Sequence, residues 1–191
     1  METKIKAMKT LITSTLTALI TLLAVGYAFA DGARNNLSVA PQKVYPKMIE
    51  AVKAQDWNKL NNALKILQPL SEEIDNTLRV NLTVELKQAI ADRNSDLAEA
   101  KVLEFIVGGI RSLLILSGRE DTPELRKEMF RQAFTEFVAI EPYLKKLNVM
   151  QTELIMENFR TSYNNIKDKS RFITNAMIIN KQLRKVIEGK P

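Results

Sequence analysis

Apolar residues follow a helical period along most of the chain. From about Pro46 onward they recur every three or four positions, as they do on one face of an α-helix. This stretch has no runs in which Val, Thr or aromatic residues alternate with polar ones, and no Asn-Gly or Asp-Gly turns. Those patterns mark strands and hairpins. We therefore predict an all-α fold.

Prolines and capping residues predict two short helices at the start of this region. Pro46 suits the first turn of a helix that we expect to end near residue 55. Asp56 is expected to cap a second helix, residues 57–68, which carries three leucines on one face. Pro69 is expected to end that helix, and residues 71–82 are expected to form a connection.

A unit of similar plan follows. Asn81 or Thr83 is expected to cap a short helix, and a polar turn follows at residues 93–95. Asp96, with Glu99 three residues later, has the form of a capping box at the start of a longer helix. The two units match at a spacing of about 38 residues if one residue is left as a gap. Two copies are too few for a solenoid, so we interpret them as a duplicated helical hairpin inside one bundle.

The helix predicted for residues 96–117 is the most apolar segment after residue 31. Its apolar side chains cover nearly the whole circumference, and a helix that is apolar on all sides is buried. We therefore expect it to be the central helix. The residues concerned are Leu97, Leu103, Phe105, Ile106, Val107, Ile110, Leu113, Leu114, Ile115 and Leu116.

Two further long helices are predicted. Thr122 followed by Pro123 is a strong helix start, and Pro142 is expected to kink or end that helix. The last helix is expected to run without a break from about residue 149 to Glu188. Four main helices with short joints predict an antiparallel bundle that forms a single domain, residues 46–191. The aromatic residues of these two helices, Phe130, Phe134, Phe137, Phe159 and Tyr163, are assigned to its core.

The first thirty residues have the form of a secretion signal. Three lysines precede a largely apolar run, residues 11–30, which ends in Ala28-Phe29-Ala30. Small residues at Ala28 and Ala30 fit the pocket of a signal peptidase, so we predict cleavage after Ala30 and a periplasmic or secreted mature protein. An uncleaved N-terminal anchor is the alternative, because about 20 apolar residues can span a bilayer. Residues 31–45 are polar and aperiodic and are predicted to be a flexible tether.

The composition excludes several kinds of chemistry. The chain has no Cys and no His, which leaves no disulfide, thiolate nucleophile, Ser-His-Asp triad or histidine-bound metal. Its formal net charge is +6, and residues 160–191 carry most of the basic excess. Such asymmetry can mark an anionic partner, although basic residues also complement the C-terminal end of a helix dipole. With modest charge and no recognised motif, we expect no nucleic-acid binding.

Three residues of the central helix are the candidate binding site. Glu104, Gly108 and Arg111 share roughly one face, and the two charges interrupt an otherwise apolar segment. They could line a pocket for a small polar or anionic ligand, with Arg111 as a planar donor for a carboxylate or phosphate. Alternatively, the charges lie at the surface or in structural ion pairs, and the glycines admit close approach of another helix.

No metal or cofactor site is predicted. Glu136 and Glu141 are five residues apart and diverge on a helix. The acidic residues at 72, 73 and 75 are expected to lie in a solvated loop. Methionines such as Met150, Met156 and Met177 are interpreted as core residues rather than copper ligands.

The export signal, basic balance and helical mature part broadly resemble small periplasmic helical chaperones and adaptor proteins. Leu82-Thr83 matches the start of their Leu-Thr motif, but Val84-Glu85-Leu86 stands where Gln is expected, so no residue roles are transferred. We predict an exported, non-enzymatic protein that binds a partner protein, an envelope surface or a small anionic ligand. The alternative is a small-ligand or metal-binding protein, or an enzyme, that uses carboxylates and Arg111.

Overall fold

A computed structural model describes residues 37–189. The predicted signal peptide with Ala28 and Ala30, and residues 31–36 of the predicted tether, lie outside the described residues. Within them every regular element is an α-helix, which confirms the all-α prediction. The eight described helices are α2 (Pro41–Lys53), α3 (Trp57–Ile66), α4 (Gln68–Leu78), α5 (Leu82–Ala91), α6 (Ser95–Arg119), α7 (Pro123–Leu147), α8 (Val149–Asn164) and α9 (Lys169–Glu188).

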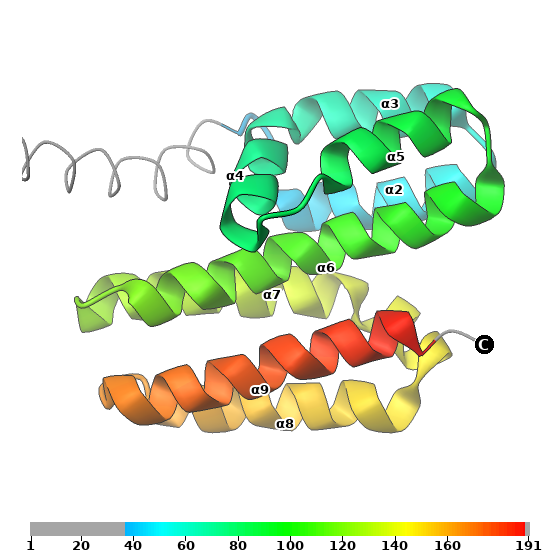
Figure 1. The fold of residues 1–191 in the computed structure, drawn as a ribbon. Helices are drawn as coiled ribbons and strands as arrows, with labels where there is room; N and C mark the ends of the chain where they lie inside the picture. Colours follow the sequence, from blue (N-terminus) through cyan, green and yellow to red (C-terminus); the bar gives the residue numbers. More distant parts are fainter. Residues whose placement is uncertain (1–36, 190–191) are drawn as a thin grey trace, which may run out of the picture. The chain divides into compact units, whose positions relative to one another are not determined.

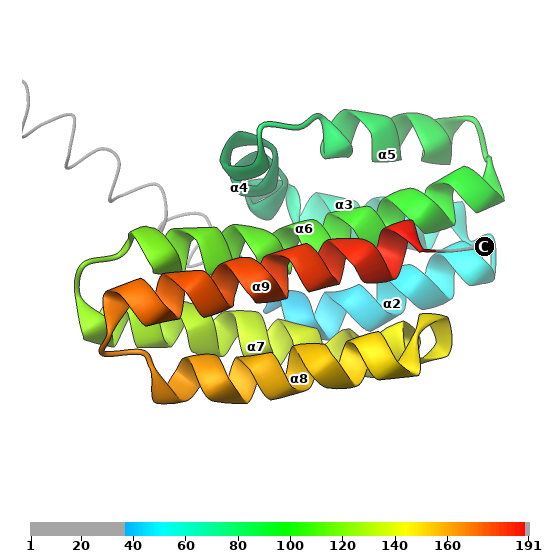
Figure 2. The same cartoon turned by 60° about the horizontal axis from the view of Figure 1, so that its bottom comes forward.

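Helix α6 is at the centre of the described part, as its apolar circumference predicted. It packs against α2, α4, α5, α7 and α9 (Figures 1 and 2). Thirteen of its 25 residues are buried, among them Phe105, Ile106 and Ile110. Because neighbours cover it on several sides, this helix needs no broad polar face.

The long helices contact one another in a closed order: α6 packs against α7 and α9, and α8 also packs against α7 and α9. The shorter helices lie on the other side of α6, where α4 and α5 pack against it and α3 packs against α2 and α5 (Figure 1). Within residues 37–189, none of the helices has the length and hydropathy that a membrane span requires.

The first helix begins earlier than the sequence predicted. Helix α2 starts at Pro41 rather than Pro46, so the last five residues of the predicted tether are helical. Val44 and Tyr45 are buried in the core, and their burial stabilises the additional turn. Pro46 lies inside the helix, where it removes only one backbone donor.

The connection predicted for residues 71–82 is wrong, because most of it is helix α4. Pro69 lies in the first turn of α4, where backbone N–H groups have no partner within the helix. The missing N–H of proline therefore costs no hydrogen bond, and Pro69 begins a helix. Leu70 and Ile74, four residues apart, are fully buried and dock α4 onto the core. The helix ends at Arg79, which has a left-handed backbone (φ 56°).

The prediction of one unbroken C-terminal helix is also wrong. The chain turns between Asn164 and Lys169, and α8 and α9 pack against each other. Asp168 starts the second helix by accepting a hydrogen bond from the Arg171 backbone N–H at 3.1 Å. The turn brings Phe159 of α8 and Phe172 of α9 to the same ring of α7, an arrangement that one straight helix does not allow.

Two smaller boundaries differ from the prediction. Helix α6 is capped by Asn94, whose side chain accepts from the Leu97 N–H at 3.1 Å, and Asp96 lies in its first turn. Pro142 does not end α7, which continues to Leu147.

The two hairpins, α2 with α3 and α5 with α6, share the same turn. Gln55 and Arg93, thirty-eight residues apart, both have a left-handed backbone, with φ of 53° and 50°. In each hairpin the next residue donates its N–H five positions back: Asp56 to Ala51 at 2.8 Å and Asn94 to Ala89 at 3.1 Å. Asp56 therefore corresponds to Asn94, and the gap placed in the sequence alignment is not needed.

Candidate functional site

The three residues predicted as a site point to different neighbours. Glu104 accepts a hydrogen bond from Lys101 Nζ at 2.8 Å, and Lys101 also pairs with Glu85 of α5 at 2.7 Å. The hydrogen bonds that Lys101 donates to Glu104 and Glu85 raise the pKa of Lys101. Glu104 thus belongs to a partly exposed ion-pair cluster of α5 and α6.

Gly108 is explained by close helix packing. A Cβ atom at this position would lie 3.0 Å from Ile74 Cγ2 and 3.4 Å from Leu82 Cδ1. At the neighbouring Gly109 it would lie 2.4 Å from the hydroxyl of Tyr45. The two glycines allow α4, α5 and α2 to approach α6, which offsets their cost of about 1 kcal/mol each relative to Ala.

Arg111 is half-buried and contacts α9. Its Nε donates to Asn180 Oδ1 at 2.7 Å. Burial lowers the pKa of Arg111, the positive charge of Arg184 lowers it further, and Glu188 opposes them. Glu104, Gly108 and Arg111 do not line either of the two pockets described below.

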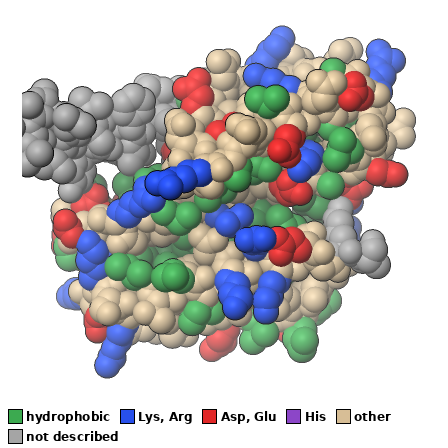
Figure 3. All heavy atoms as spheres, in the orientation of Figure 1, with side chains coloured by type: hydrophobic (Ala, Val, Ile, Leu, Met, Phe, Trp, Pro, Cys, Tyr) green, Lys and Arg blue, Asp and Glu red, His purple; other side chains and the backbone are tan. Residues whose placement is uncertain are grey.

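A shallow groove lies between the end of α6 and α9. Its volume is about 270 Å³. Asn180, the partner of Arg111, and Met177 are among its lining residues, and because Met177 and Met150 are exposed, their interpretation as core residues is wrong. Figure 3 shows Lys and Arg side chains with apolar side chains between them over this region. The lining residues are Leu114, Ile115, Gly118, Arg119, Ile173, Ala176, Met177 and Asn180.

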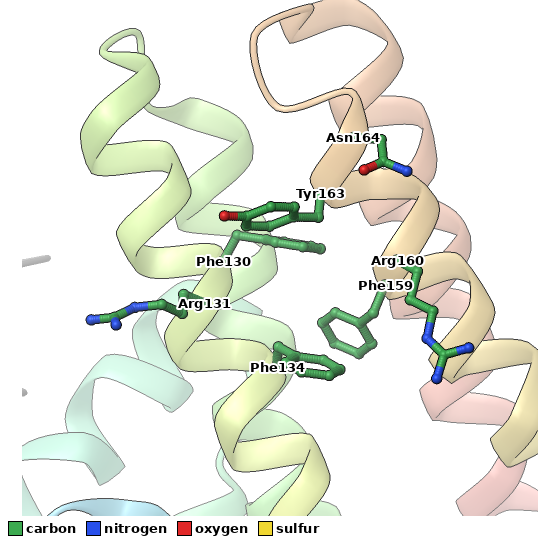
Figure 4. Close-up of a pocket in the computed structure, with 7 residues that line it drawn as sticks. All are labelled: Phe130, Arg131, Phe134, Phe159, Arg160, Tyr163 and Asn164. Carbon is green, nitrogen blue, oxygen red and sulfur yellow. The ribbon is translucent and has the colours of Figure 1, made fainter.

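A larger and more apolar pocket lies between α7 and α8 (Figure 4). It has a volume of about 350 Å³, within the range of small-molecule sites. Four of its seven lining residues are aromatic and two are arginines. The lining residues are Phe130, Arg131, Phe134, Phe159, Arg160, Tyr163 and Asn164.

The aromatic wall results from helical spacing on α7 and α8. Phe130, Phe134 and Phe137 recur on one face of α7, and all three rings lie 5.2 to 5.4 Å from the Phe159 ring of α8. Phe130 and Phe159 are buried, whereas Tyr163 is half-exposed at the opening. Rings at these separations attract one another and form a stiff apolar wall.

Basic side chains flank the opening, and the guanidinium groups of Arg131 and Arg160 point outward from it (Figure 4). Lys127 Nζ lies over the Tyr163 ring, 5.5 Å from its centroid. The stems of Arg131 and Arg160 line the pocket, and their guanidinium groups extend to its two sides (Figure 4). Arg131 pairs with Glu128 at 2.9 Å, which raises the pKa of Arg131 and lowers that of Glu128. None of the seven lining residues is acidic.

The core also contains hydrogen-bonded carboxylates. Tyr45 donates to Glu136 Oε2 at 3.0 Å, and the Ser112 hydroxyl donates to Glu73 Oε1 at 2.7 Å. The expectation of a solvated acidic loop is wrong, because Glu72, Glu73 and Asp75 all lie in helix α4 and Glu73 is buried. Within residues 37–189, no three Asp or Glu side chains are grouped closely enough to hold a metal ion.

In comparisons with protein-family models, curated proteins and solved structures, no match to this chain was found. The candidate site therefore depends on its own geometry. Sequence reasoning missed the α7/α8 pocket because Phe130, Phe134 and Phe159 have the spacing of ordinary core residues. The available signal was the pair of arginines, Arg131 and Arg160, each directly following one of these phenylalanines.

Proposed function

We propose that this chain is an exported, non-enzymatic antiparallel helical bundle that binds a small apolar ligand in the pocket between α7 and α8. The observation that carries the proposal is an open aromatic pocket of about 350 Å³ at the surface between α7 and α8, with the buried rings of Phe130 and Phe159 in its wall. Concave sites lined by apolar and aromatic side chains with a few polar groups are the usual form of small-molecule sites.

Two features of the chain support the individual parts of this proposal. The lysine-rich start, the apolar run and Ala28-Phe29-Ala30 support export. The lining residues contain no carboxylate, Ser or Lys that could act as nucleophile or general base, which favours binding over catalysis. Asn164 and the hydroxyl of Tyr163 are the polar groups that would orient a ligand.

The test is a fluorescence titration of the purified protein with the neutral probe N-phenyl-1-naphthylamine. We expect saturable binding at one site per chain. Tyr163→Ala, which removes a ring from the opening, should weaken binding about three- to tenfold, because a contact between two aromatic groups contributes about 0.5–1.5 kcal/mol beyond its buried area.

Leu125→Ala is the matched control. Leu125 lies on α7, does not line the pocket and has the same 45 % exposure as Tyr163. Its replacement should leave probe affinity unchanged. Absence of saturable binding, or equal effects of the two substitutions, would contradict the proposed function.

A further inference from the structure

The proposed pocket combines an aromatic interior with a cationic rim. Its interior is formed by Phe130, Phe134, Phe159 and Tyr163. The rim carries Arg131 and Arg160, and Lys127 lies over the outer ring (Figure 4). A ligand that fills this space needs an apolar body, and its polar end emerges among the cationic groups.

An aromatic interior by itself is also compatible with a cationic ligand. Rings bind ammonium groups through their negative faces, with about 0.5–2 kcal/mol per contact. In this pocket, however, Lys127 already occupies a position over the Tyr163 ring. A second cation would meet the like charges of Lys127 and Arg160, whereas the charge of Arg131 is partly offset by its ion pair with Glu128.

A buried positive charge lies behind the wall of the pocket. The guanidinium of Arg126 is 5.8 Å from the centroid of the Phe172 ring, and that ring packs edge-on against Phe130 at 5.2 Å. Arg126 makes four hydrogen bonds to main-chain carbonyls, including those of Glu120 and Ile166. The hydrogen bond from Lys169 lowers the pKa of Asp121, and the charge of Arg126 lowers it further. The Arg126 guanidinium therefore contacts the pocket wall through the Phe172 ring.

We propose that the pocket selects an amphipathic anion, with an aromatic or acyl body between α7 and α8 and a carboxylate, sulfonate or phosphate group at Arg131 and Arg160. This inference rests on the proposed function and adds the charge of the ligand to it. Both arginines are exposed, so rotation about their stems brings the guanidinium groups over the opening. A guanidinium can then donate two parallel hydrogen bonds to the anionic group.

The test compares two probes that differ only in a sulfonate group: neutral N-phenyl-1-naphthylamine and anionic 8-anilinonaphthalene-1-sulfonate. The wild-type protein is expected to bind the anion more tightly, by about fivefold or more, and added salt should reduce only this preference. The double variant Arg131→Gln/Arg160→Gln should bind both probes with similar affinity. Neutral-probe affinity should stay within about twofold, because the aromatic wall is unchanged.

Two further variants make the test specific. Glu128→Gln releases Arg131 from its ion pair and should tighten binding of the anionic probe alone. Arg171→Gln is the control, because Arg171 makes the same kind of ion pair with Asp168, three residues earlier, but does not line the pocket. It should leave the preference intact.

Each outcome has a definite meaning. Equal binding of the two probes, or tighter binding of the neutral one, overturns the inference but leaves the proposed function standing. An effect of Arg171→Gln as large as that of the double variant also overturns it, because the preference would then be a general surface effect. If neither probe binds, or binding does not respond to Tyr163→Ala, the proposed function fails as well.

Discussion

Arg126 shows how one side chain can join two distant connections. It is only 1 % exposed, and its guanidinium donates to the carbonyls of Glu120 and Asp121 after α6 and of Ile166 after α8. Its ring contact with Phe172 ties the same group to α9. A planar group with five donors can reach carbonyls on different sides in a fixed geometry, whereas an ammonium has only three donors, all on one atom.

We therefore expect Arg126→Met to lower the free energy of unfolding by about 2–4 kcal/mol, because it leaves buried carbonyls without donors. Arg126→Lys should restore little of the loss. Urea unfolding measures the effect. Arg171→Met, at an exposed position on α9, should change stability by less than about 0.5 kcal/mol. An unchanged unfolding midpoint for Arg126→Met would show that these hydrogen bonds contribute nothing net.

Gly109 and Gly118 offer a pair of opposite predictions on the same helix. A methyl group at Gly109 would come within 2.4 Å of the Tyr45 hydroxyl, whereas at Gly118 it would lie 3.6 Å from Ile173 Cγ1. Gly109→Ala should destabilise by about 1–3 kcal/mol through overpacking. Gly118→Ala should stabilise by up to about 1 kcal/mol through helix propensity. Thermal melts of the two variants that move in the same direction would refute this account.

At the scale of elements, apolar pattern determined which helix is central, and local turn chemistry determined where short helices end. Asp56 caps α3 through the Lys59 N–H at 3.0 Å, as its type predicted. The repeated turn at Gln55 and Arg93 carries no glycine, which hid its equivalence from sequence inspection. Helix boundaries predicted from prolines were inaccurate, because a proline is compatible both with the end of one helix and with the first turn of the next.

The central role of α6 leads to a prediction within that helix. Leu113 is 2 % exposed and Leu97 is 41 % exposed. Leu113→Asp buries a carboxylate that has no partner to neutralise its charge. The free energy of unfolding should fall by several kcal/mol, which is comparable with a total stability of about 5–15 kcal/mol. The domain should then be unfolded or severely destabilised by circular dichroism. Leu97→Asp should fold normally. If both variants melt like the wild type, α6 is not the centre of the core.

At the scale of the whole molecule, we propose that an export signal precedes a helical binding domain. We predict that the mature protein begins at Asp31, because Ala28 and Ala30 suit signal peptidase. N-terminal sequencing of material recovered from the cell envelope measures this. An intact Met1 on membrane-bound protein would contradict cleavage and favour the anchor. Ala30→Leu should block processing, while Ser38→Leu, beyond the cleavage point, should not.

The helical class, the position of the central helix and the exclusion of cysteine and histidine chemistry could all be read from the amino-acid sequence. The excluded chemistry follows from the composition. The helical class and the central helix follow from the spacing of apolar residues, because side chains three or four positions apart share one face of any α-helix. Two features became visible only in three dimensions: α8 and α9 pack against each other, and Phe130, Phe134 and Phe159 line an open pocket between α7 and α8. Periodicity shows which face of a helix is apolar. It does not show which other helix packs against that face, or how much of the face this helix buries. That depends on contacts between residues far apart in the chain, such as Arg126 with Ile166.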